Sequence, residues 1–460
     1  DTEIMRRTNL RLSMGWILAQ SDRHTEAARL VESIVDDVTA DPGDRCEGAE
    51  ICATAAVFAD EIEQVNSIVV PWIETLPTQP LLCHFVGINL LAFLEMYRGA
   101  SRQARYCYRS LPNDHDSVGC YALGWRDWII GISYLWEGQT ALGADWLGAA
   151  LECAESDAGR RSPVAVMLAS ALAAALLDCG RLSEAAALIA DRLDVLTRRA
   201  PPEALMMGQL TAARLAELAN QEQSALALLD DLLALGEQRR LPRLRIASLC
   251  ERIRLHALRN RTTLCATAER MLDQLVSELS GHAWGLLEPV VDIQIGIARA
   301  YAAIARQDWS LALNWLNATA PIAERLQRGR DMIQIDLLSA LAKKRCGEDG
   351  TNLLQEALVR AKMLGLARIL TDTHPDLVHW ACQLHLVDDA RASLHTRFDP
   401  IQPLDKKIQL VSTAVRWTVS TRSALLSPKE REVLALLINN MSNKQIALAM
   451  GISSETIKWH

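Results

Sequence analysis

Apolar residues along most of this chain recur with a helical period, in Ala- and Leu-rich stretches that single turn residues interrupt. A small residue follows each turn residue by five positions and opens the next stretch. The clearest copy is 172–188, with Gly180 at the turn and Ala185 as the small residue. The other turn and small-residue pairs are Asp22/Ala27, Asp60/Val65, Gly99/Ala104, Gly138/Gly143, Asn220/Ala225, Asn260/Cys265 and Gln307/Ala312. Successive turns lie 38 to 47 residues apart, which predicts a structural repeat of about 40 residues.

Each repeat predicts a pair of antiparallel helices. Gly, Asn and Asp accept the left-handed backbone conformation that ends a helix, and every turn position except Gln307 carries one of them. A small residue just after the turn lets two helices approach closely. We therefore expect an all-α fold, a right-handed superhelical solenoid of hairpins similar to tetratricopeptide repeats, over residues 1–395. In such a solenoid each hairpin contacts mainly its neighbours.

The repeat pattern ends near residue 395. Pro400 and Pro403 lie close together in a Ser- and Thr-rich stretch, which predicts a linker at 396–424 with one short helix at 406–415. Three further helices are expected between the last repeat and this linker, at 332–345 before Gly347, at 352–364 before Gly365 and at 376–386.

Composition agrees with a helical globular protein. Half of the residues are apolar and only 5% are aromatic, which favours helices over a sandwich or barrel. The net charge of −8 argues against a basic nucleic-acid coat protein. The longest apolar run, Val164 to Leu177, has 14 residues, too few to span a bilayer. The chain starts at Asp1 without a signal segment, which suggests a fragment or a processed product. Its 11 cysteines form no C-x-x-C pair, so we expect reduced thiols and a cytoplasmic location.

Three helix starts can be recognised near the C-terminus. Ser-Pro-Lys-Glu at 427–430 is a capping box with Pro at the first helical position. Ser-Asn-Lys-Gln at 442–445 is a second capping box, and Ser453 caps a third helix. The predicted helices are 428–437, 443–450 and a third that starts at 454.

The spacing of the last two helices fits a helix-turn-helix motif. Ala447 is small where the third helix must cross the second, and Gly451, four residues later, supplies the positive φ of the tight turn. Ile452 and Ile457 would hold the third helix against the first. The structural positions of this predicted motif are Ser442, Asn443, Ala447, Gly451, Ile452, Ser453 and Ile457.

Residues 425–460 resemble the first half of a LuxR-type DNA-binding domain. The resemblance rests on Leu-Ser-Pro-Lys-Glu-Arg-Glu-Val-Leu at 426–434, Met-Ser-Asn-Lys-Gln-Ile-Ala at 441–447 and Ile-Ser-Ser-Glu-Thr-Ile-Lys-Trp-His at 452–460. It covers neither the rest of the recognition helix nor the fourth helix of that family. Double-stranded DNA is the implied partner, with the DNA-contacting residues Lys444, Ser454, Thr456, Lys458 and His460.

The resemblance also implies roles for these residues. Thr456 and Lys458 would face the major groove and Lys444 would contact a phosphate, while His460 would contact a base or the backbone. Independently, Thr456 and Lys458 lie near the start of the third helix, where recognition helices meet bases. The alternative is that they are solvated polar positions on a short helix.

A helical-repeat solenoid followed by a LuxR-type domain resembles the large MalT-like activators. In that family a nucleotide-binding module precedes the solenoid, and the solenoid senses an inducer. No lysine precedes Lys343, so no G-x4-G-K-[ST] loop occurs before it. The chain thus resembles a MalT-like regulator without its ATPase module, and we expect no cofactor. The implied partners are a small-molecule inducer, or a protein or peptide, on the solenoid, with RNA polymerase as a further candidate.

Four tryptophans form the densest aromatic group in the chain. They are candidates for an effector pocket in which an aromatic or sugar ligand would stack, although packing between helices is the more common role of such residues. The four are Trp125, Trp128, Trp136 and Trp146.

A second group joins three histidines to a cysteine near the end of the repeats. On a helix, the last three of its members spread over an arc of about 120°, which is wide for one tetrahedral metal ion. We expect a partly exposed last hairpin there and no metal site. The members are His374, His379, Cys382 and His385.

A transcription regulator is the leading functional hypothesis. No catalytic motif occurs at a readable spacing, so we expect no enzyme and assign no catalytic residue. Two alternatives stay open: an interaction scaffold with a vestigial helix-turn-helix tail, and a solenoid receptor for a short peptide. DNA binding would separate the leading hypothesis from both.

Overall fold

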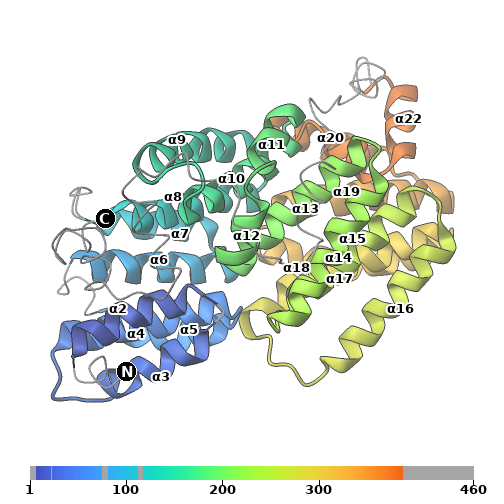
Figure 1. Cartoon of the computed structure of the whole chain (residues 1–460). Coiled ribbons are helices and arrows are strands. Elements are labelled where there is room, and N and C mark those ends of the chain that lie inside the picture. Colours follow the sequence, from blue (N-terminus) through green and yellow to red (C-terminus); the bar gives the residue numbers. More distant parts are fainter. Residues whose placement is uncertain (1–6, 22, 75–80, 112–117, 387–460) are drawn as a thin grey trace, which may run out of the picture. The chain divides into compact units, whose positions relative to one another are not determined.

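The computed structural model describes residues 7–21, 23–74, 81–111 and 118–386, all within the first of two compact units, Asp1–Ile408. The described residues form α-helices and short 3-10 helices without any strand, so the all-α prediction is confirmed (Figure 1). The helices are α2 (Thr8–Ala19), α3 (His24–Val35), α4 (Pro42–Phe58), α5 (Ile62–Val69), η1 (Val70–Trp72), α6 (Leu81–Tyr97), α7 (Ser101–Cys107), η3 (Tyr108–Ser110), α8 (Cys120–Trp136), α9 (Thr140–Ala158), α10 (Pro163–Asp178), α11 (Leu182–Ile189), α12 (Leu193–Arg199), α13 (Pro202–Leu218), α14 (Glu222–Gln238), α15 (Pro242–Leu258), α16 (Thr262–Glu278), η4 (Gly285–Leu287), α17 (Glu288–Ala305), α18 (Trp309–Arg325), α19 (Gly329–Cys346), α20 (Thr351–Leu364), α21 (Ile369–Thr373) and α22 (Pro375–Gln383).

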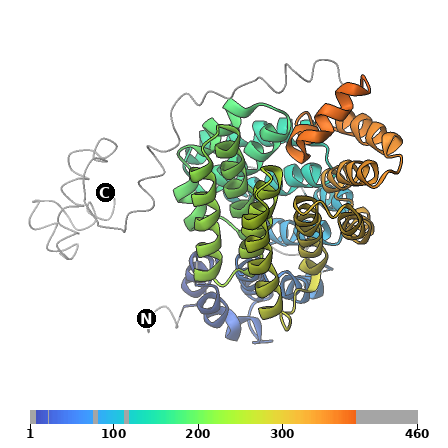
Figure 2. The same cartoon turned by 90° about the vertical axis from the view of Figure 1, so that its right-hand side faces the viewer.

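The helices follow one another as antiparallel hairpins in sequence order, from the blue N-terminal pairs to the orange C-terminal ones (Figures 1 and 2). The first helix of a pair is buried on most of its surface, as in α10, where Val164 to Ala173 are all buried. The second helix is amphipathic, as in α16, which buries Cys265, Ala268, Leu272 and Leu275 at helical spacing. The hairpins thus form an inner layer of Ala- and Leu-rich helices covered by an outer layer.

Every predicted turn that lies within the described residues is present in the structure. Their φ angles lie between 55° and 82°, in the left-handed region. In each turn the following residue donates its N–H to the carbonyl oxygen five positions earlier, which closes the end of the first helix. Asp22 lies outside the described residues, and the confirmed turn residues are Asp60, Gly99, Gly138, Gly180, Asn220, Asn260 and Gln307.

The small residues after the turns are all buried, as predicted. Each lies where the two helices first cross. Its backbone N–H donates the first regular hydrogen bond of the second helix to the carbonyl oxygen of the residue that follows the turn, as Ala185 does to Arg181 over 3.1 Å. Ala185 has no exposed surface. The buried members are Ala27, Val65, Ala104, Gly143, Ala185, Ala225, Cys265 and Ala312.

The structure adds turns that the pattern does not predict. Arg240 and Gln327 end α14 and α18 with φ of 57° and 53°, although neither residue type favours the left-handed region. Of the helices predicted after the repeats, α19 and α20 end before Gly347 and Gly365 as expected. The last one, α22, ends at Gln383 instead of continuing to 386.

Hairpins far apart in the sequence also touch, beyond the neighbour contacts expected of a solenoid. The turn at Gly99 meets the end of α18 so closely that a Cβ on Gly99 would lie 2.7 Å from the carbonyl oxygen of Arg325. The turn at Gly138 meets the start of α19, where a Cβ would lie 3.1 Å from the backbone nitrogen of Arg330. Both positions therefore need glycine for close approach as well as for positive φ. The superhelix closes on itself through its turns.

A buried ion-pair cluster strengthens this closure. Arg243 at the start of α15 is 1% exposed and donates to both carboxylate oxygens of Asp60, over 2.8 and 2.6 Å. It also donates to Glu203 on α13, which accepts a second hydrogen bond from the Tyr97 hydroxyl at 3.0 Å. Burial alone would lower the pKa of Arg243, but Asp60, Tyr97 and Glu203 together raise it well above its usual range. The turn after α4 is thus joined to helices 140 or more residues away in the sequence.

The expectation that no apolar segment is long enough to span a bilayer can be checked for the described helices alone. None of them is both long and apolar enough to cross a bilayer.

Candidate functional site

The predicted DNA-binding head lies outside the described residues, and so does the predicted linker at 396–424. The five predicted DNA contacts Lys444, Ser454, Thr456, Lys458 and His460 therefore stay predictions. The same holds for the predicted motif positions Ser442, Asn443, Ala447, Gly451, Ile452, Ser453 and Ile457.

The four tryptophans of the predicted effector pocket occupy different surroundings. Trp125 and Trp128 on α8 are in edge contact, with ring centroids 5.5 Å apart. Trp128 is fully buried, and Trp136 packs edge-on against Tyr97 at 5.2 Å. Trp146 on α9 is 41% exposed. Of the four, Trp125 borders a cavity, so the effector-pocket prediction is retained for this position.

The cavity beside Trp125 is apolar and has a volume of about 400 Å³. Side chains of α2, α4, α6 and α8 line it, among them Phe93 and Tyr121. Its amide Asn89 is already engaged, because it donates to the carbonyl of Ala122 at 3.0 Å and accepts from the Tyr108 hydroxyl at 3.1 Å. This cavity therefore offers an apolar surface and few free polar groups.

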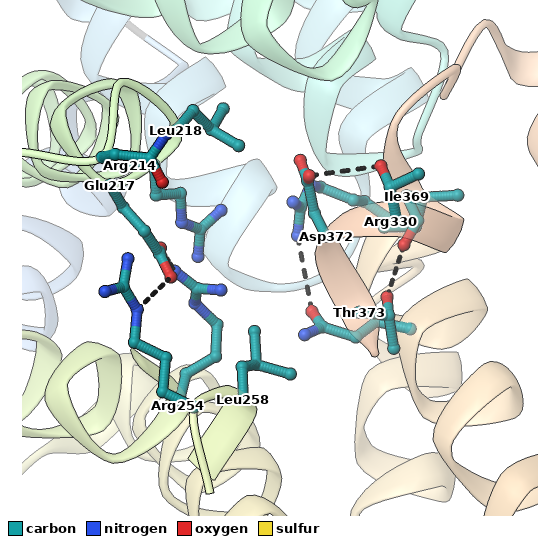
Figure 3. A pocket seen from close by; sticks show the side chains of 13 residues that line it. Arg214, Glu217, Leu218, Arg254, Leu258, Arg330, Ile369, Asp372 and Thr373 are labelled. Atoms are coloured by element: carbon teal, nitrogen blue, oxygen red, sulfur yellow. Dashed lines mark hydrogen bonds and ion pairs between the residues drawn. The ribbon is translucent and has the colours of Figure 1, made fainter. Parts of the chain in front are cut away.

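A second cavity, of about 250 Å³, is polar (Figure 3). Helices α13 and α15 form one wall, and α19 with α21 forms the facing wall. Figure 3 shows Arg214, Glu217 and Arg254 on the first wall and Arg330, Asp372 and Thr373 on the second.

A buried carboxylate, Glu251, holds two arginines of the first wall. Glu251 accepts from Arg214 through Nε at 2.8 Å and Nη2 at 2.9 Å, and from Arg254 through Nε at 2.8 Å. Burial alone would raise the pKa of Glu251, but the charges of Arg214 and Arg254 outweigh it and lower this pKa to about 2. Glu251 is therefore ionised throughout the physiological pH range and fixes two guanidinium groups in place.

The second wall is ordered in a similar way. Arg330 donates to Asp178 at the end of α10 through Nε at 2.7 Å and Nη2 at 3.0 Å. Gln334, one helical turn later, donates to the Tyr301 hydroxyl at 3.0 Å, and this hydroxyl donates to the carbonyl of Thr373 at 2.9 Å. Hydrogen bonds thus connect α17, α19 and α21 at the cavity.

The sequence gives no signal for this polar cavity. Its four arginines lie on three hairpins, with Arg254 and Arg259 on the same one, and no short motif joins all four. Only the superhelical packing brings them together. A search for arginines on the buried inner helices could have singled out Arg254, which is 7% exposed, but it would not have paired this residue with Arg330.

The histidines and the cysteine near residue 380 do not gather. His374 caps α22, since its Nδ1 accepts from the backbone N–H of Asp376 at 3.1 Å, and His379 contacts the Gln383 amide at 2.9 Å. Cys382 is exposed, and His385 follows α22 with φ of 54°. Within the described ranges, no three His, Cys, Asp or Glu side chains are placed to hold a metal ion.

His374 makes the stability of the fold sensitive to pH. Burial lowers its pKa below the usual 6.5, so the folded state prefers the neutral ring. Stability is then full above about pH 6.5 and falls as the pH drops towards the folded-state pKa, because the unfolded chain binds the proton first. We expect His374→Asn, which keeps a capping acceptor, to lose less stability than the wild type between about pH 7.5 and pH 5.5.

Urea denaturation at both pH values measures this difference. His84 and His256 should keep part of the slope in the variant, because burial lowers their pKa values too. The exposed His379 on the same helix provides the control, and His379→Asn should retain the wild-type slope. An unchanged slope in His374→Asn would contradict the assignment.

Comparisons with known proteins bear on the family of the C-terminal segment and on the fold of the repeats. Residues 424–460 match the family of bacterial regulatory proteins of the luxR type. The fold is similar to a Rap protein crystallised in complex with competence and sporulation factor, with a TM-score of 0.52 at 11% sequence identity over 77% of this chain and 99% of that one. The apo form of RapI matches with a TM-score of 0.32 at 11% identity, over 84% of this chain and 93% of that one. No curated protein sequence matches the chain. The chain therefore carries a LuxR-type helix-turn-helix domain at its C-terminus and shares a helical-repeat fold with the Rap protein that binds competence and sporulation factor.

Proposed function

We propose that this protein is a transcription regulator whose helical-repeat domain receives a signal and whose LuxR-type head binds operator DNA. The observation that carries this proposal is the luxR-family match at 424–460, on a chain whose described residues form one helical-repeat unit. In this proposal residues 1–395 form the sensory domain, 396–424 the linker and 425–460 the head. The head acts on DNA, so the protein acts in the cytoplasm.

The finer proposal is a MalT-like regulator without a nucleotide-binding module in this chain. Its support is the order of a helical-repeat superhelix and a LuxR-type head, together with the absence of a G-x4-G-K-[ST] loop from the sequence. A regulatory head on a repeat scaffold fits a protein that performs no catalysis and needs no cofactor. Inducer binding to the repeats would then change how the head engages the operator or RNA polymerase.

Two lysines of the head should affect DNA binding differently. Lys458→Ala should cost ~1–3 kcal/mol on the selected operator if Lys458 contacts a base. Lys444→Ala should weaken binding to all sequences alike and lower the salt slope by about one, as expected for a phosphate contact. Fluorescence anisotropy at several salt concentrations measures both effects, with the protein as its gene encodes it and an operator selected from randomised DNA.

Lys362→Ala provides the matched control, because Lys362 is an exposed lysine on the outer helix α20 of the repeats. Its variant should bind operator like the wild type. Equal operator affinity of Lys458→Ala and wild type at fixed salt would rule out the third helix of the head as the reading helix. Absence of DNA binding by the wild type would overturn the proposed function.

The fold similarity to a Rap protein bound to competence and sporulation factor supports a second candidate, a receptor for a peptide on the repeat domain. A peptide could be the signal of the proposed regulator, or it could be bound by a protein that does not act on DNA. The same anisotropy experiment separates the two, because only the regulator binds operator DNA. An interaction scaffold with a vestigial tail predicts the same negative result.

A further inference from the structure

We propose that the polar cavity between α13, α15, α19 and α21 binds a small organic anion, whose carboxylate or phosphate group contacts Arg214, Arg254 and Arg330. This site would be the signal-receiving site of the proposed regulator, and in that respect the inference rests on the proposed function. Anion binding is measured without DNA, so the proposed anion site and the proposed function can be disproved independently.

The charge of the cavity favours an anion. Four arginines line it, against the two carboxylates of Glu217 and Asp372. The carboxylates that hold Arg214 and Arg330, Glu251 and Asp178, are not among the lining residues. The positive groups therefore face the cavity in greater number than the negative ones. An anion that enters meets guanidinium groups that are already oriented, which lowers the entropic cost of binding.

The hydrogen bonds of these arginines leave one edge available. Arg214 and Arg330 both use Nε and Nη2 for a bidentate bond to their carboxylates. Among the described residues, Nη1 of Arg214 and Nη1 of Arg254 donate to no acceptor, and Nη1 of Arg330 makes only a 3.5 Å contact with Gln334. A guanidinium carries five N–H groups, so each can hold its structural carboxylate and still donate to a second anion.

The size and remaining lining narrow the ligand class. About 250 Å³ is slightly below the range of about 300–1,000 Å³ that is usual for drug-sized ligands, which favours a small metabolite. Asn220 offers a polar side chain for a hydroxyl of the ligand, and Leu218 and Leu258 offer a short apolar surface. A phosphorylated or carboxylated sugar, or a hydroxy acid of similar size, meets these requirements.

The position of the cavity suggests how binding would act on the fold. A ligand held by Arg254 and Arg330 would connect α15 to α19, which belong to different hairpins. Arg330 also joins α19 to Asp178 at the end of α10. Binding would thus stabilise one closed arrangement of the superhelix relative to a more open one.

The test is calorimetric titration of the full chain with glucose 6-phosphate and with glucuronate, using glucose as the neutral counterpart. We expect at least one of the two anions to bind with one site per chain, while glucose does not bind. Preference for glucose 6-phosphate would identify a phosphate as the recognised group, and preference for glucuronate a carboxylate. Failure of both anions to bind more strongly than glucose would overturn the proposal.

Two variants link the binding to the cavity. Arg214→Gln should weaken anion binding at least about 10-fold, the loss expected when a charged hydrogen bond is removed. Arg259→Gln removes a positive charge from the cavity lining but none of the three proposed contacts, so it should weaken anion binding by a smaller factor. Both should fold, because Glu251 keeps Arg254 and Glu222 keeps Arg261 as partners. Arg299→Gln is the matched control, since Arg299 pairs with Asp273 at 3.0 Å outside this cavity. Wild-type affinity in both cavity variants would place the anion elsewhere and overturn the proposal.

Anisotropy on operator DNA separates this inference from the proposed function. If the protein binds the anion through Arg214 but does not bind DNA, the anion site is supported and the proposed function as a transcription regulator is overturned. If the protein binds DNA but not the anions, the proposed function is supported and the anion site is overturned.

Discussion

Replacing Arg243 by alanine should lower the free energy of unfolding by about 3–5 kcal/mol, the range measured when one partner of a buried ion pair is removed. Arg243 is 1% exposed and is the shared partner of Asp60 and Glu203, whose side chains are each 5% exposed. In Arg243→Ala both carboxylates stay buried near each other, where no other described cation pairs with them. Urea denaturation followed by circular dichroism measures the loss.

An exposed ion pair gives the matched control. Arg181 pairs with Glu184 on the surface, with side chains 52% and 57% exposed, so Arg181→Ala should cost less than about 1 kcal/mol. A second comparison removes the buried charges first: in the Asp60→Asn, Glu203→Gln background, Arg243→Ala should cost less than in the wild type. Asparagine suits position 60, because Asp60 has a φ of 63° and asparagine accepts this left-handed conformation. An equal loss for Arg243→Ala and Arg181→Ala would refute the role of the buried cluster.

Replacing Ala185 by arginine should cost at least about 3 kcal/mol, because it adds both volume and an unpaired charge at a helix crossing. Ala185 has no exposed surface and lies where α11 packs against α10, just after the turn at Gly180. The helices cannot separate there without breaking the hydrogen bonds that close the turn. The shift of the thermal or urea midpoint measures the effect.

The control for this variant lies on the same helix. Ala187 is exposed, two residues further along α11, so Ala187→Arg should change stability by no more than about 0.5 kcal/mol. Similar midpoints for the two variants would show that Ala185 does not occupy the close crossing between α10 and α11.

Local features of the fold could be predicted from the sequence because they depend on neighbouring residues. Gly180 and Asn220 end helices because their own backbone preferences allow φ above zero, and Ala185 is buried because it comes one helical turn after such a stop. Arg240 and Gln327 adopt the same conformation without that preference, so their turns were missed. Their conformation is imposed by the packing of the helices on either side.

The candidate sites also differ in whether they depend on neighbouring residues or on the packing of distant hairpins. The helix caps and spacing of the C-terminal head are local, and the match at 424–460 agrees with the LuxR-type resemblance of this segment. Trp125 and Trp136 are 11 residues apart, yet one borders a cavity and the other is buried against Tyr97. A spacing of 11 residues places both on nearly the same face of α8, so what distinguishes them is the neighbours that each end of α8 meets: Phe58 lies beside Trp125, and Tyr97 lies beside Trp136.

The repeat and its turns follow from residues within about 40 positions of one another, and the family of the C-terminal head follows from the resemblance of 425–460 to LuxR-type domains. In contrast, Arg243 meets Asp60, and Arg330 faces Arg254 across a cavity, only because distant hairpins pack together. Such contacts depend on the small rotation between successive hairpins, summed over several repeats. A rotation of that kind leaves no mark in a short stretch of sequence, so the closure of the superhelix and its polar cavity appear only in the folded chain.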